Sequence, residues 1–361
     1  MPTKRAFCCL IVLCTLVLTA CAPQPQPRDC ARPDVFCAGL VTAFGGVNSG
    51  INHEAWLGLQ DAKAAHLVDR IDYIQTVDVR DRQLNIATLA AEGYDVIVTS
   101  GSSISADTAA VAAKYTEISF IGIEQPQDKP LPNVAGLVFH EERSSFLAGA
   151  LAALVSETGY VAGVCDAMFI DAMRRYCDGF AAGARYARPG IHVSVTYRDG
   201  PNSRLFNDPD WGSAAALQQV QGGADVLFAA GGTTAQGALL TAAANGAYVI
   251  GSETDLYGEL AELRPMLLTS TVNDIRLGVV DLLRQARAGN LPAGEYVGVV
   301  KLAPWHDLDS QIPLDVKQEL EKIKIRLEVG TITLDIPYKA APPEPTGTKK
   351  PKHKPKPTPT P

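Results

Sequence analysis

Short runs of uninterrupted apolar residues alternate with amphipathic helical patterns along most of this chain, and this alternation restricts the fold more than any other feature. Residues 95–99 (DVIVT) and 225–230 (DVLFAA) are of the kind found in strands buried on both faces of a parallel sheet. Further strand patterns lie at 36–44, 72–77, 119–124, 159–165, 193–197 and 248–251, and helical patterns lie at 52–68, 81–92, 106–115, 146–155, 171–187, 211–221 and 234–245. The chain is therefore predicted to be an α/β protein.

The alternation restarts after the small-residue helix at 146–155, which indicates two doubly wound lobes rather than one long sheet. In doubly wound sheets, ligands bind beyond the carboxyl ends of the strands. The candidate binding segments are therefore those that follow predicted strands, at residues 45–52, 100–103, 124–127, 231–234 and 252–255.

The first residues have the order of an export signal. Lys4 and Arg5 precede an apolar run at 6–18, which is shorter than the roughly 20 residues that a membrane-spanning helix needs. Small residues then lead to Cys21, in an arrangement that resembles a bacterial lipobox. We predict a signal peptide at residues 1–20, lipidation of Cys21 and a place on the outer face of the cell membrane. Ordinary secretion, with Cys21 merely nearby, is the alternative.

Two segments are unsuited to a packed core. Residues 21–34 are rich in Pro and Gln and form a predicted linker, and residues 338–361 alternate Lys with Pro. The second segment is predicted to be a disordered tail. A solvated tail without a partner is the simpler interpretation, and contact with anionic lipid or wall polymer is the alternative.

Four cysteines remain beyond the signal and the lipidation site: Cys30, Cys37, Cys165 and Cys177. In an exported protein they can form two disulfides, for which the sequence allows three pairings. We predict the local pairs, 30 with 37 and 165 with 177, because each closes a short loop. Free buried thiols are the alternative. Neither spacing matches a metal site, and no metal is predicted.

Charge and motifs exclude several classes of function. The formal net charge of −7 includes two cations of the signal, so the processed chain is more acidic still, which argues against a nucleic-acid partner. There is no G-x-S-x-G or H-E-x-x-H motif, and Gly45-Gly46 lacks the spacing of a nucleotide-phosphate loop. We therefore predict neither enzymatic activity nor a cofactor.

Several blocks resemble the basic membrane protein family, whose members are substrate-binding lipoproteins of ABC importers that characteristically bind purine nucleosides. Residues 39–59 (GLVTAFGGVNSGINHEAWLGL) are similar to the opening signature of the family. Later blocks follow in the family order, with SFLAGALA at 145–152, RYCDGFAAG at 175–183, FNDP at 206–209, GGADV at 222–226 and YVIGSETD at 248–255. The resemblance covers roughly residues 35–300.

The resemblance implies a type I periplasmic-binding-protein fold, with two Rossmann-like lobes joined by three crossovers and the ligand between them. We expect lobe 1 at residues 35–140, with a returning segment near 252–275. We expect lobe 2 at residues 141–251, with a returning segment near 276–337.

The resemblance also implies binding roles for individual residues. Asn52 matches an asparagine that contacts the base. Glu124 stands where the family usually has an aspartate facing the purine edge, and Phe206 lies in the block whose phenylalanine stacks on the base. Glu253 replaces an aspartate that holds ribose hydroxyls, and Asp255 matches the acid two residues further on.

Other positions depart from the family. The family aspartate before Gly-Gly is Ala43, a stacking phenylalanine is Ile51, and a ribose-facing lysine is Asn273. Because aromatic stacking on a base contributes about 1–3 kcal/mol in nucleic-acid complexes, the loss of one stacking face is expected to alter specificity.

These features predict a lipid-anchored solute-binding protein that acts as a monomer, captures a nucleoside-like small molecule and delivers it to an ABC permease. The alternative is a surface sensor or structural lipoprotein that keeps the same fold without a role in transport.

Overall fold

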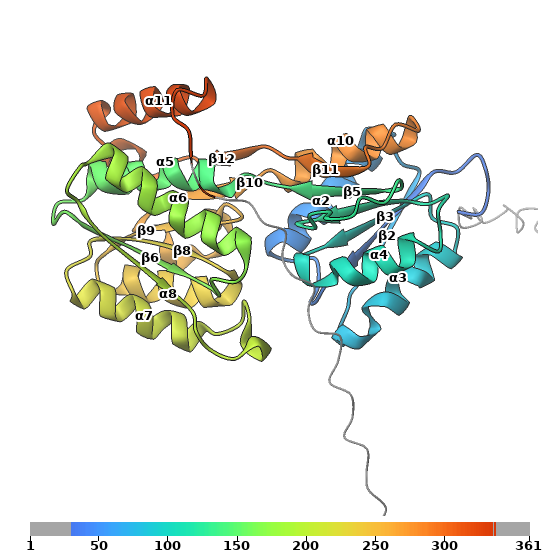
Figure 1. Cartoon of the computed structure of the whole chain (residues 1–361), viewed down its shortest axis with the longest axis horizontal. Coiled ribbons are helices and arrows are strands. Elements are labelled where there is room, and N and C mark those ends of the chain that lie inside the picture. The colour runs from blue at the N-terminus through green and yellow to red at the C-terminus, as the bar shows by residue number, and fades with distance from the viewer. Residues whose placement is uncertain (1–29, 335, 337–361) are drawn as a thin grey trace, which may run out of the picture.

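Two lobes lie side by side in the computed structural model, which describes residues 30–334 and 336 (Figure 1). Each lobe contains a six-stranded sheet with helices on both faces. The predicted signal peptide, Cys21 and the predicted tail at 338–361 lie outside the described residues. Within the described part, no helix is long and apolar enough to cross a membrane.

The sheet of lobe 1 is parallel throughout, with strand order β11-β5-β4-β3-β1-β2. Its strands are β1 (Cys37–Thr42), β2 (Arg70–Ile74), β3 (Val96–Ser100), β4 (Ser119–Ile123), β5 (Val134–Val138) and β11 (Gly294–Val297).

The sheet of lobe 2 has the order β12-β10-β9-β8-β6-β7, and only its edge strand β12 pairs in the antiparallel direction among the described residues. Its strands are β6 (Tyr160–Cys165), β7 (His192–Tyr197), β8 (Val226–Ala230), β9 (Tyr248–Gly251), β10 (Leu267–Asn273) and β12 (Val300–Leu302).

Successive strand residues point to opposite faces of a sheet, so a strand buried on both faces supplies two cores. In lobe 1, Leu40 and Val98 pack under α2 (Gly50–Ala64) and α10 (Ile275–Arg287). Their neighbours Val41 and Ile97 pack under α3 (Arg82–Ala91) and α4 (Ser105–Ala112). Short 3-10 helices η1 (Val79–Asp81) and η2 (Ser102–Ile104) precede α3 and α4.

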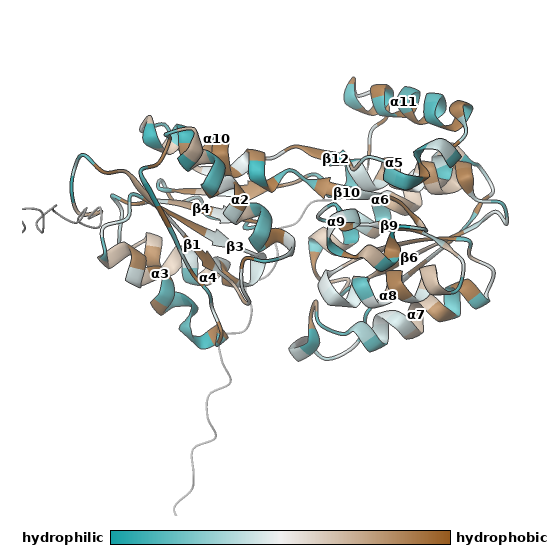
Figure 2. Cartoon of the chain, turned by 180° about the vertical axis from the view of Figure 1, so that it is seen from behind, coloured by the Kyte–Doolittle hydropathy of each residue, from teal (hydrophilic) through white to brown (hydrophobic). Residues whose placement is uncertain are grey.

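Lobe 2 repeats this arrangement. One face of its sheet is covered by α5 (Glu141–Val155) and α6 (Asp171–Ala187), with α11 (Leu314–Glu328) packed outside α5, and the other by α7 (Pro209–Gln221) and α8 (Gly232–Ala244). Figure 2 shows the hydrophobic residues on the strands and the hydrophilic ones mainly on the outer sides of the helices. The remaining short helices are η3 (Asn202–Arg204), α9 (Leu256–Glu259), η4 (Ala261–Leu263) and η5 (His306–Gln311).

Glycines bring α5 and α6 into backbone contact. A Cβ atom on Gly149 would overlap the carbonyl oxygen of Phe180, and a Cβ atom on Gly183 would overlap that of Phe146. This close approach places the first turn of α5 beside the first half of α6, where several polar side chains meet.

The chain passes between the lobes three times, from β5 to α5, from β10 to α10 and from β11 to β12. The connecting segments are hydrogen-bonded to one another: Gly298 N–H donates to the Val138 carbonyl at 2.8 Å, and Asp274 N–H donates to the Val299 carbonyl at 2.9 Å. The type I periplasmic-binding-protein fold with three crossovers, predicted above, is confirmed.

The first predicted returning segment was wrong, and the second was wrong for α10 and β11 but right for β12 and α11, which lie in lobe 2. Residues 252–275 were assigned to lobe 1, yet β10 lies in the sheet of lobe 2, beside β9. Residues 276–337 were assigned to lobe 2, yet α10 packs on α2 and β11 pairs with β5, both in lobe 1. The helix is held there because the Gly58 backbone of α2 lets Val279 approach closely.

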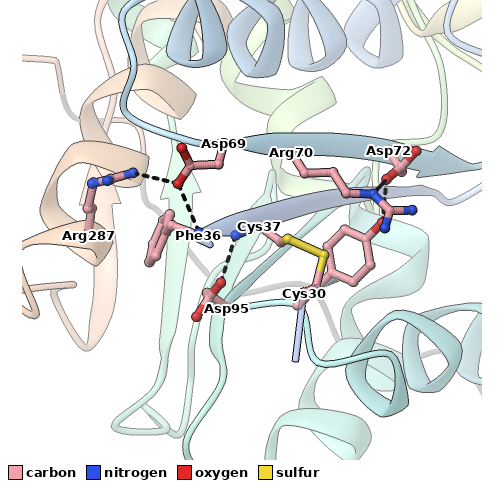
Figure 3. The surroundings of a disulfide bond; sticks show 9 residues. Cys30, Phe36, Cys37, Asp69, Arg70, Asp72, Asp95 and Arg287 are labelled. Carbon is pink, nitrogen blue, oxygen red and sulfur yellow. Dashed lines mark hydrogen bonds and ion pairs between the residues drawn. A yellow bond between two sulfur atoms is a disulfide. The ribbon is translucent and has the colours of Figure 1, made fainter. Parts of the chain in front are cut away.

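Both disulfides join the local pairs predicted from the sequence, Cys30–Cys37 and Cys165–Cys177. Figure 3 shows the first of them at the amino end of β1. The backbone there is fixed by two carboxylates, since Phe36 N–H donates to Asp69 at 3.0 Å and Cys37 N–H donates to Asp95 at 2.7 Å. The start of the described chain is thus fastened to the amino end of the lobe 1 sheet.

Candidate functional site

The five candidate segments follow β1, β3, β4, β8 and β9, so each begins at the carboxyl end of a parallel strand. Three segments belong to lobe 1 and two to lobe 2. Glu124 comes directly after β4 in lobe 1, and Glu253 comes shortly after β9 in lobe 2.

Three of the predicted ligand residues have a left-handed backbone: Glu124 at φ 59°, Phe206 at φ 59° and Glu253 at φ 72°. This conformation costs on the order of 1–3 kcal/mol for a residue with a side chain, and it concentrates at functional sites. The surrounding structure must therefore hold these residues in place.

The turn after β4 is fixed by hydrogen bonds on both sides of Glu124. Its own N–H donates to the Leu137 carbonyl at 2.8 Å. The next residue, Gln125, is fully buried, and its amide donates to Thr99 Oγ1 at 2.9 Å and to the Gly101 carbonyl at 3.0 Å. The turn after β4 is thereby joined to the end of β3.

The turn after β9 is fixed by β10. Asn273 N–H donates to the Glu253 carbonyl at 3.1 Å, and Thr254 N–H donates to the Ser252 carbonyl at 2.9 Å. Because Asn273 is also the last residue of β10, Glu253 is tied directly to one of the three connections between the lobes.

The carboxylates of Glu124 and Glu253 make no hydrogen bond or ion pair with any residue that the structure describes, although both side chains are partly buried. Burial raises the pKa of Glu124 to about 8, and the negative charge of Glu253 adds to this rise. Burial likewise raises the pKa of Glu253 to about 7, with a further contribution from Glu141. The two carboxylates, one from each lobe, are thus close enough to repel each other.

Two buried polar side chains lie beside this carboxylate pair. Asn273 is 1% exposed, and neither its amide nitrogen nor its amide oxygen has a hydrogen-bond partner among the described residues. The hydroxyl of Tyr176, in α6, is also buried, and it lies beside the Asn273 side chain without a well-formed hydrogen bond. Burial and the charges of Glu141, Glu253 and Glu124 raise the pKa of Tyr176 well above its ordinary value.

A buried ion pair borders the same region. Arg175 Nε lies 2.5 Å from Glu141 and 3.8 Å from Glu142, both in the first turn of α5. Burial raises the pKa of Glu141 in spite of the opposing effect of Arg175. The Glu142 carboxyl group also lies 2.9 Å from His140 Nδ1.

On lobe 1, the predicted ligand residue Asn52 holds the loop after β1. Its amide donates to the carbonyls of Phe44 at 3.0 Å and Gly46 at 3.1 Å, and its oxygen accepts from Ser100 Oγ at 2.6 Å. Both of its N–H groups are therefore engaged within the protein. Ile51, partly buried, packs against the lobe 1 core and lies near Gly101.

Arg82 was not singled out from the sequence, yet it joins the residue just after β1 to the candidate segment that follows β3. Its guanidinium donates to the Ala43 carbonyl at 2.8 Å and to the carbonyl and hydroxyl of Ser103 at 2.7 and 2.8 Å. The arginine has no sequence motif around it, so only its three-dimensional position shows this role.

On lobe 2, the backbone of Phe206 is held by the buried carboxylate of Asp166. That carboxylate accepts from Phe206 N–H at 3.1 Å, from Thr234 Oγ1 at 2.8 Å and from Arg198 Nε at 3.1 Å. The Phe206 carbonyl accepts from Thr233 N–H at 2.9 Å. Its ring is partly buried against the lobe 2 core.

Asp255, also a predicted ligand residue, has both carboxylate oxygens engaged. Oδ1 accepts from Tyr257 N–H at 3.2 Å at the start of α9, and Oδ2 lies 2.8 Å from His306 Nε2. The rings of Tyr257 and His306 stack with centroids 4.0 Å apart. The structure therefore gives Asp255 a part in holding the turn.

Two surface hollows lie away from these residues. One, of about 660 Å³, is lined by residues near the end of α11, and the other, of about 490 Å³, by residues between α2 and β2. Across residues 30–334, no group of acidic residues, histidines or cysteines is arranged to hold a metal ion. The polar groups gathered between the lobes remain the stronger candidate site.

The chain is similar to several known proteins. A family model described as "ABC transporter substrate-binding protein PnrA-like" (Bmp) matches residues 41–302. A Listeria innocua protein named "CD4+ T-cell-stimulating antigen" is 26% identical, over 91% of this chain and 98% of its own length. The Lactococcus lactis "ABC transporter nucleoside-binding protein BmpA" is 25% identical, over 82% and 88%.

Solved structures support the fold. A solute-binding protein of an ABC transporter system from Aeropyrum pernix superposes with a TM-score of 0.69 at 20% identity, covering 84% of this chain and 94% of the other. A solute-binding protein from Conexibacter woesei gives a TM-score of 0.68 at 20% identity, covering 83% and 99%.

Proposed function

The chain belongs to the Bmp family of PnrA-like ABC transporter substrate-binding proteins, and from this premise we propose that it captures a nucleoside-like small molecule between its lobes and delivers it to an ABC permease. The family consists of binding proteins, so the chain is not an enzyme. The nucleoside class is supported by the name of the Lactococcus lactis relative.

The observation that carries the proposal is the pair of unengaged carboxylates, Glu124 and Glu253. They come from different lobes and have no partner among the described residues, so a molecule between them can bind both lobes at once. Carboxylate oxygens accept hydrogen bonds from the hydroxyl groups of a sugar and from the N–H groups of a base.

The other site residues take supporting parts in this proposal. Asn273 offers unpaired donor and acceptor groups next to Glu253, Phe206 offers an aromatic face, and Ile51 offers an aliphatic one. Asn52 shapes the loop after β1, and Asp255 shapes the turn before α9.

We further propose that the protein works as a monomer on the outer face of the cell membrane, held by a lipid on Cys21. Two disulfides agree with an oxidising compartment outside the cytoplasm. Mass spectrometry of the membrane-extracted protein should find Cys21 acylated and residues 1–20 absent. An unmodified amino terminus would contradict the lipid anchor.

Isothermal titration of the full chain, purified in detergent, against a panel of purine and pyrimidine nucleosides tests the binding function. At least one nucleoside should bind with a dissociation constant well below millimolar. Glu117→Gln, at an exposed position of lobe 1, is the matched control and should bind like the parent. If no nucleoside binds below millimolar concentration, the nucleoside class is wrong.

A further inference from the structure

The region between the lobes holds more carboxyl groups than cationic side chains. Four carboxylates gather there, those of Glu124, Glu253, Glu141 and Glu142, as their mutual effects and contacts show. The guanidinium of Arg175 lies against Glu141 and Glu142 in the first turn of α5. Glu124 of lobe 1 lies within the electrostatic influence of Glu253 of lobe 2, and neither has an ion pair within the described residues.

A second observation points to a ligand at the same place. Asn273 and Tyr176 are each 1% exposed, and the side-chain polar atoms of both lack a well-formed hydrogen bond to the described residues; Tyr176 also lies within the electrostatic influence of Glu124, Glu253 and Glu141. Buried polar groups without partners cost free energy, so a molecule that supplies their hydrogen bonds, directly or through water, is favoured there. A metal ion does not fit, because the described acidic residues form no metal-binding group.

We propose that the molecule bound between the lobes carries a positive charge, as a protonated or N-alkylated heterocyclic base does, and that this charge is held between Glu124 and Glu253. The inference rests on the proposed binding of a nucleoside-like molecule and adds the charge of its base.

Electrostatic repulsion between the two carboxylates is the physical reason to expect a cationic ligand. Two like charges brought together in a partly buried region repel each other, and each retains its proton to a higher pH than a free carboxyl does. A cation between them relieves this repulsion and receives charge-assisted hydrogen bonds from both lobes. An anion, such as a phosphate group, would add a further like charge, so nucleotides should be excluded.

Two pairs of probes separate charge from shape. 1-Methyladenosine and N6-methyladenosine are isomers, and only the first carries a protonated base at neutral pH. 1-Methylnicotinamide and nicotinamide give the same contrast without a ribose. Titration of the full chain with all four should show that 1-methyladenosine binds on the order of tenfold tighter than its isomer, because charge-assisted hydrogen bonds are about twice as strong as neutral ones.

The outcomes distinguish the two proposals. If N6-methyladenosine binds as tightly as 1-methyladenosine or more tightly, the charge inference is overturned and the nucleoside class stands. If only 1-methylnicotinamide binds, the charge inference stands and the nucleoside class is wrong. If none of the four binds below millimolar concentration, both are overturned.

Two isosteric variants test the named residues. Glu124→Gln and Glu253→Gln each remove one negative charge and keep the size of the side chain, and each should reduce the preference for 1-methyladenosine over its isomer by about tenfold. Glu117→Gln should keep the full preference. Circular dichroism and thermal melting verify that each variant is folded. A folded pair of variants that keeps the parent preference would overturn the assignment to these residues.

Discussion

At Glu253, the backbone conformation favours glycine, whereas the proposed binding role requires a carboxylate side chain. A φ of 72° is best met by glycine, whereas binding through a carboxylate needs a side chain. The same conflict exists at Glu124 and Phe206. The hydrogen bond from Asn273 to the Glu253 carbonyl helps to hold the unfavourable conformation.

This conflict leads to a prediction for two substitutions at one position. Glu253→Ala and Glu253→Gly should both weaken ligand binding by about a hundredfold, because both remove an acceptor of charge-assisted hydrogen bonds worth about 2–3 kcal/mol. The free energy of unfolding of Glu253→Gly should nevertheless be about 1 kcal/mol higher than that of Glu253→Ala, because glycine adopts the left-handed conformation without strain. Chemical denaturation measures the difference.

The neighbouring Ser252, which is not left-handed, is the control for that comparison. There the order should reverse, with Ser252→Gly less stable than Ser252→Ala because glycine loses more entropy on folding. Equal stability of the two Glu253 variants would show that its conformation stores no strain. Binding by Glu253→Ala at parent strength would refute the binding role of the carboxylate.

The pH dependence of stability follows from the same carboxylates. In the unfolded chain a glutamate has a pKa of about 4.3, whereas in the folded protein Glu253 titrates at about 7 and Glu124 at about 8, and the pKa of Glu141 is also raised. Between these values the folded chain holds more protons, so its free energy of unfolding should fall as the pH rises from about 5 to about 8.

Thermal melting of the ligand-free protein between pH 5 and pH 9 measures this effect. Glu124→Gln has one fewer group to ionise and should lose less stability over this window than the parent. The melting temperature of Glu117→Gln should fall over this pH range by as much as that of the parent. If Glu124→Gln and the parent lose stability equally, the pKa of Glu124 is not raised in the folded protein.

At the scale of the elements, strands with uninterrupted apolar sequence were predicted correctly. β3 and β8 are examples, and α6 and β9 have the predicted bounds. β5 (VAGLV) was missed because it is short, contains small residues and follows a segment rich in Pro and Gln, so its pairing with β4 and β11 defines it. Elements after residue 251 were not assigned, and the lobe to which each belongs depends on contacts distant in sequence.

In the candidate site too, residues that follow a local sequence pattern could be predicted, and residues defined by contacts distant in sequence could not. Glu124 and Glu253 could be located because they follow recognisable strands, and the carboxyl-end rule then places them. Tyr176 could not, because its sequence position shows only a residue on the apolar face of a helix. Its hydroxyl lies beside the Asn273 side chain, which comes from a different element almost one hundred residues later in the chain. The sequence around Tyr176 does not show this proximity.

The contact between α5 and α6 gives the third prediction. Gly183→Ala should lower the free energy of unfolding by about 1–3 kcal/mol, because its methyl group would overlap the Phe146 carbonyl and force the helices apart. Denaturant titration measures the loss. Gly258→Ala, whose added Cβ has no neighbour within 4 Å, should change stability little. Equal effects of the two substitutions would show that α5 and α6 are not closely packed.

At the scale of the whole molecule, three connections join lobes that otherwise have separate sheets and cores. This arrangement permits one lobe to rotate relative to the other while each core stays intact. Ligand binding between the lobes is therefore expected to bring them closer together.

Small-angle X-ray scattering with and without ligand measures this change. The radius of gyration should be smaller with a bound nucleoside, and Glu253→Ala should show little change at the same ligand concentration. An unchanged scattering profile of the parent at saturating ligand would contradict closure of the lobes.

The disulfide at the start of the described chain has a mechanical consequence. Cys30–Cys37 fastens the chain to the amino end of β1, whereas Glu124 lies at the carboxyl end of the parallel strand β4 in the same sheet. A load applied through the segment before Cys30 therefore enters lobe 1 at the edge opposite its binding residues. Such a load does not pass through the three connections between the lobes, so the lipid anchor proposed above would leave lobe 2 able to move relative to lobe 1.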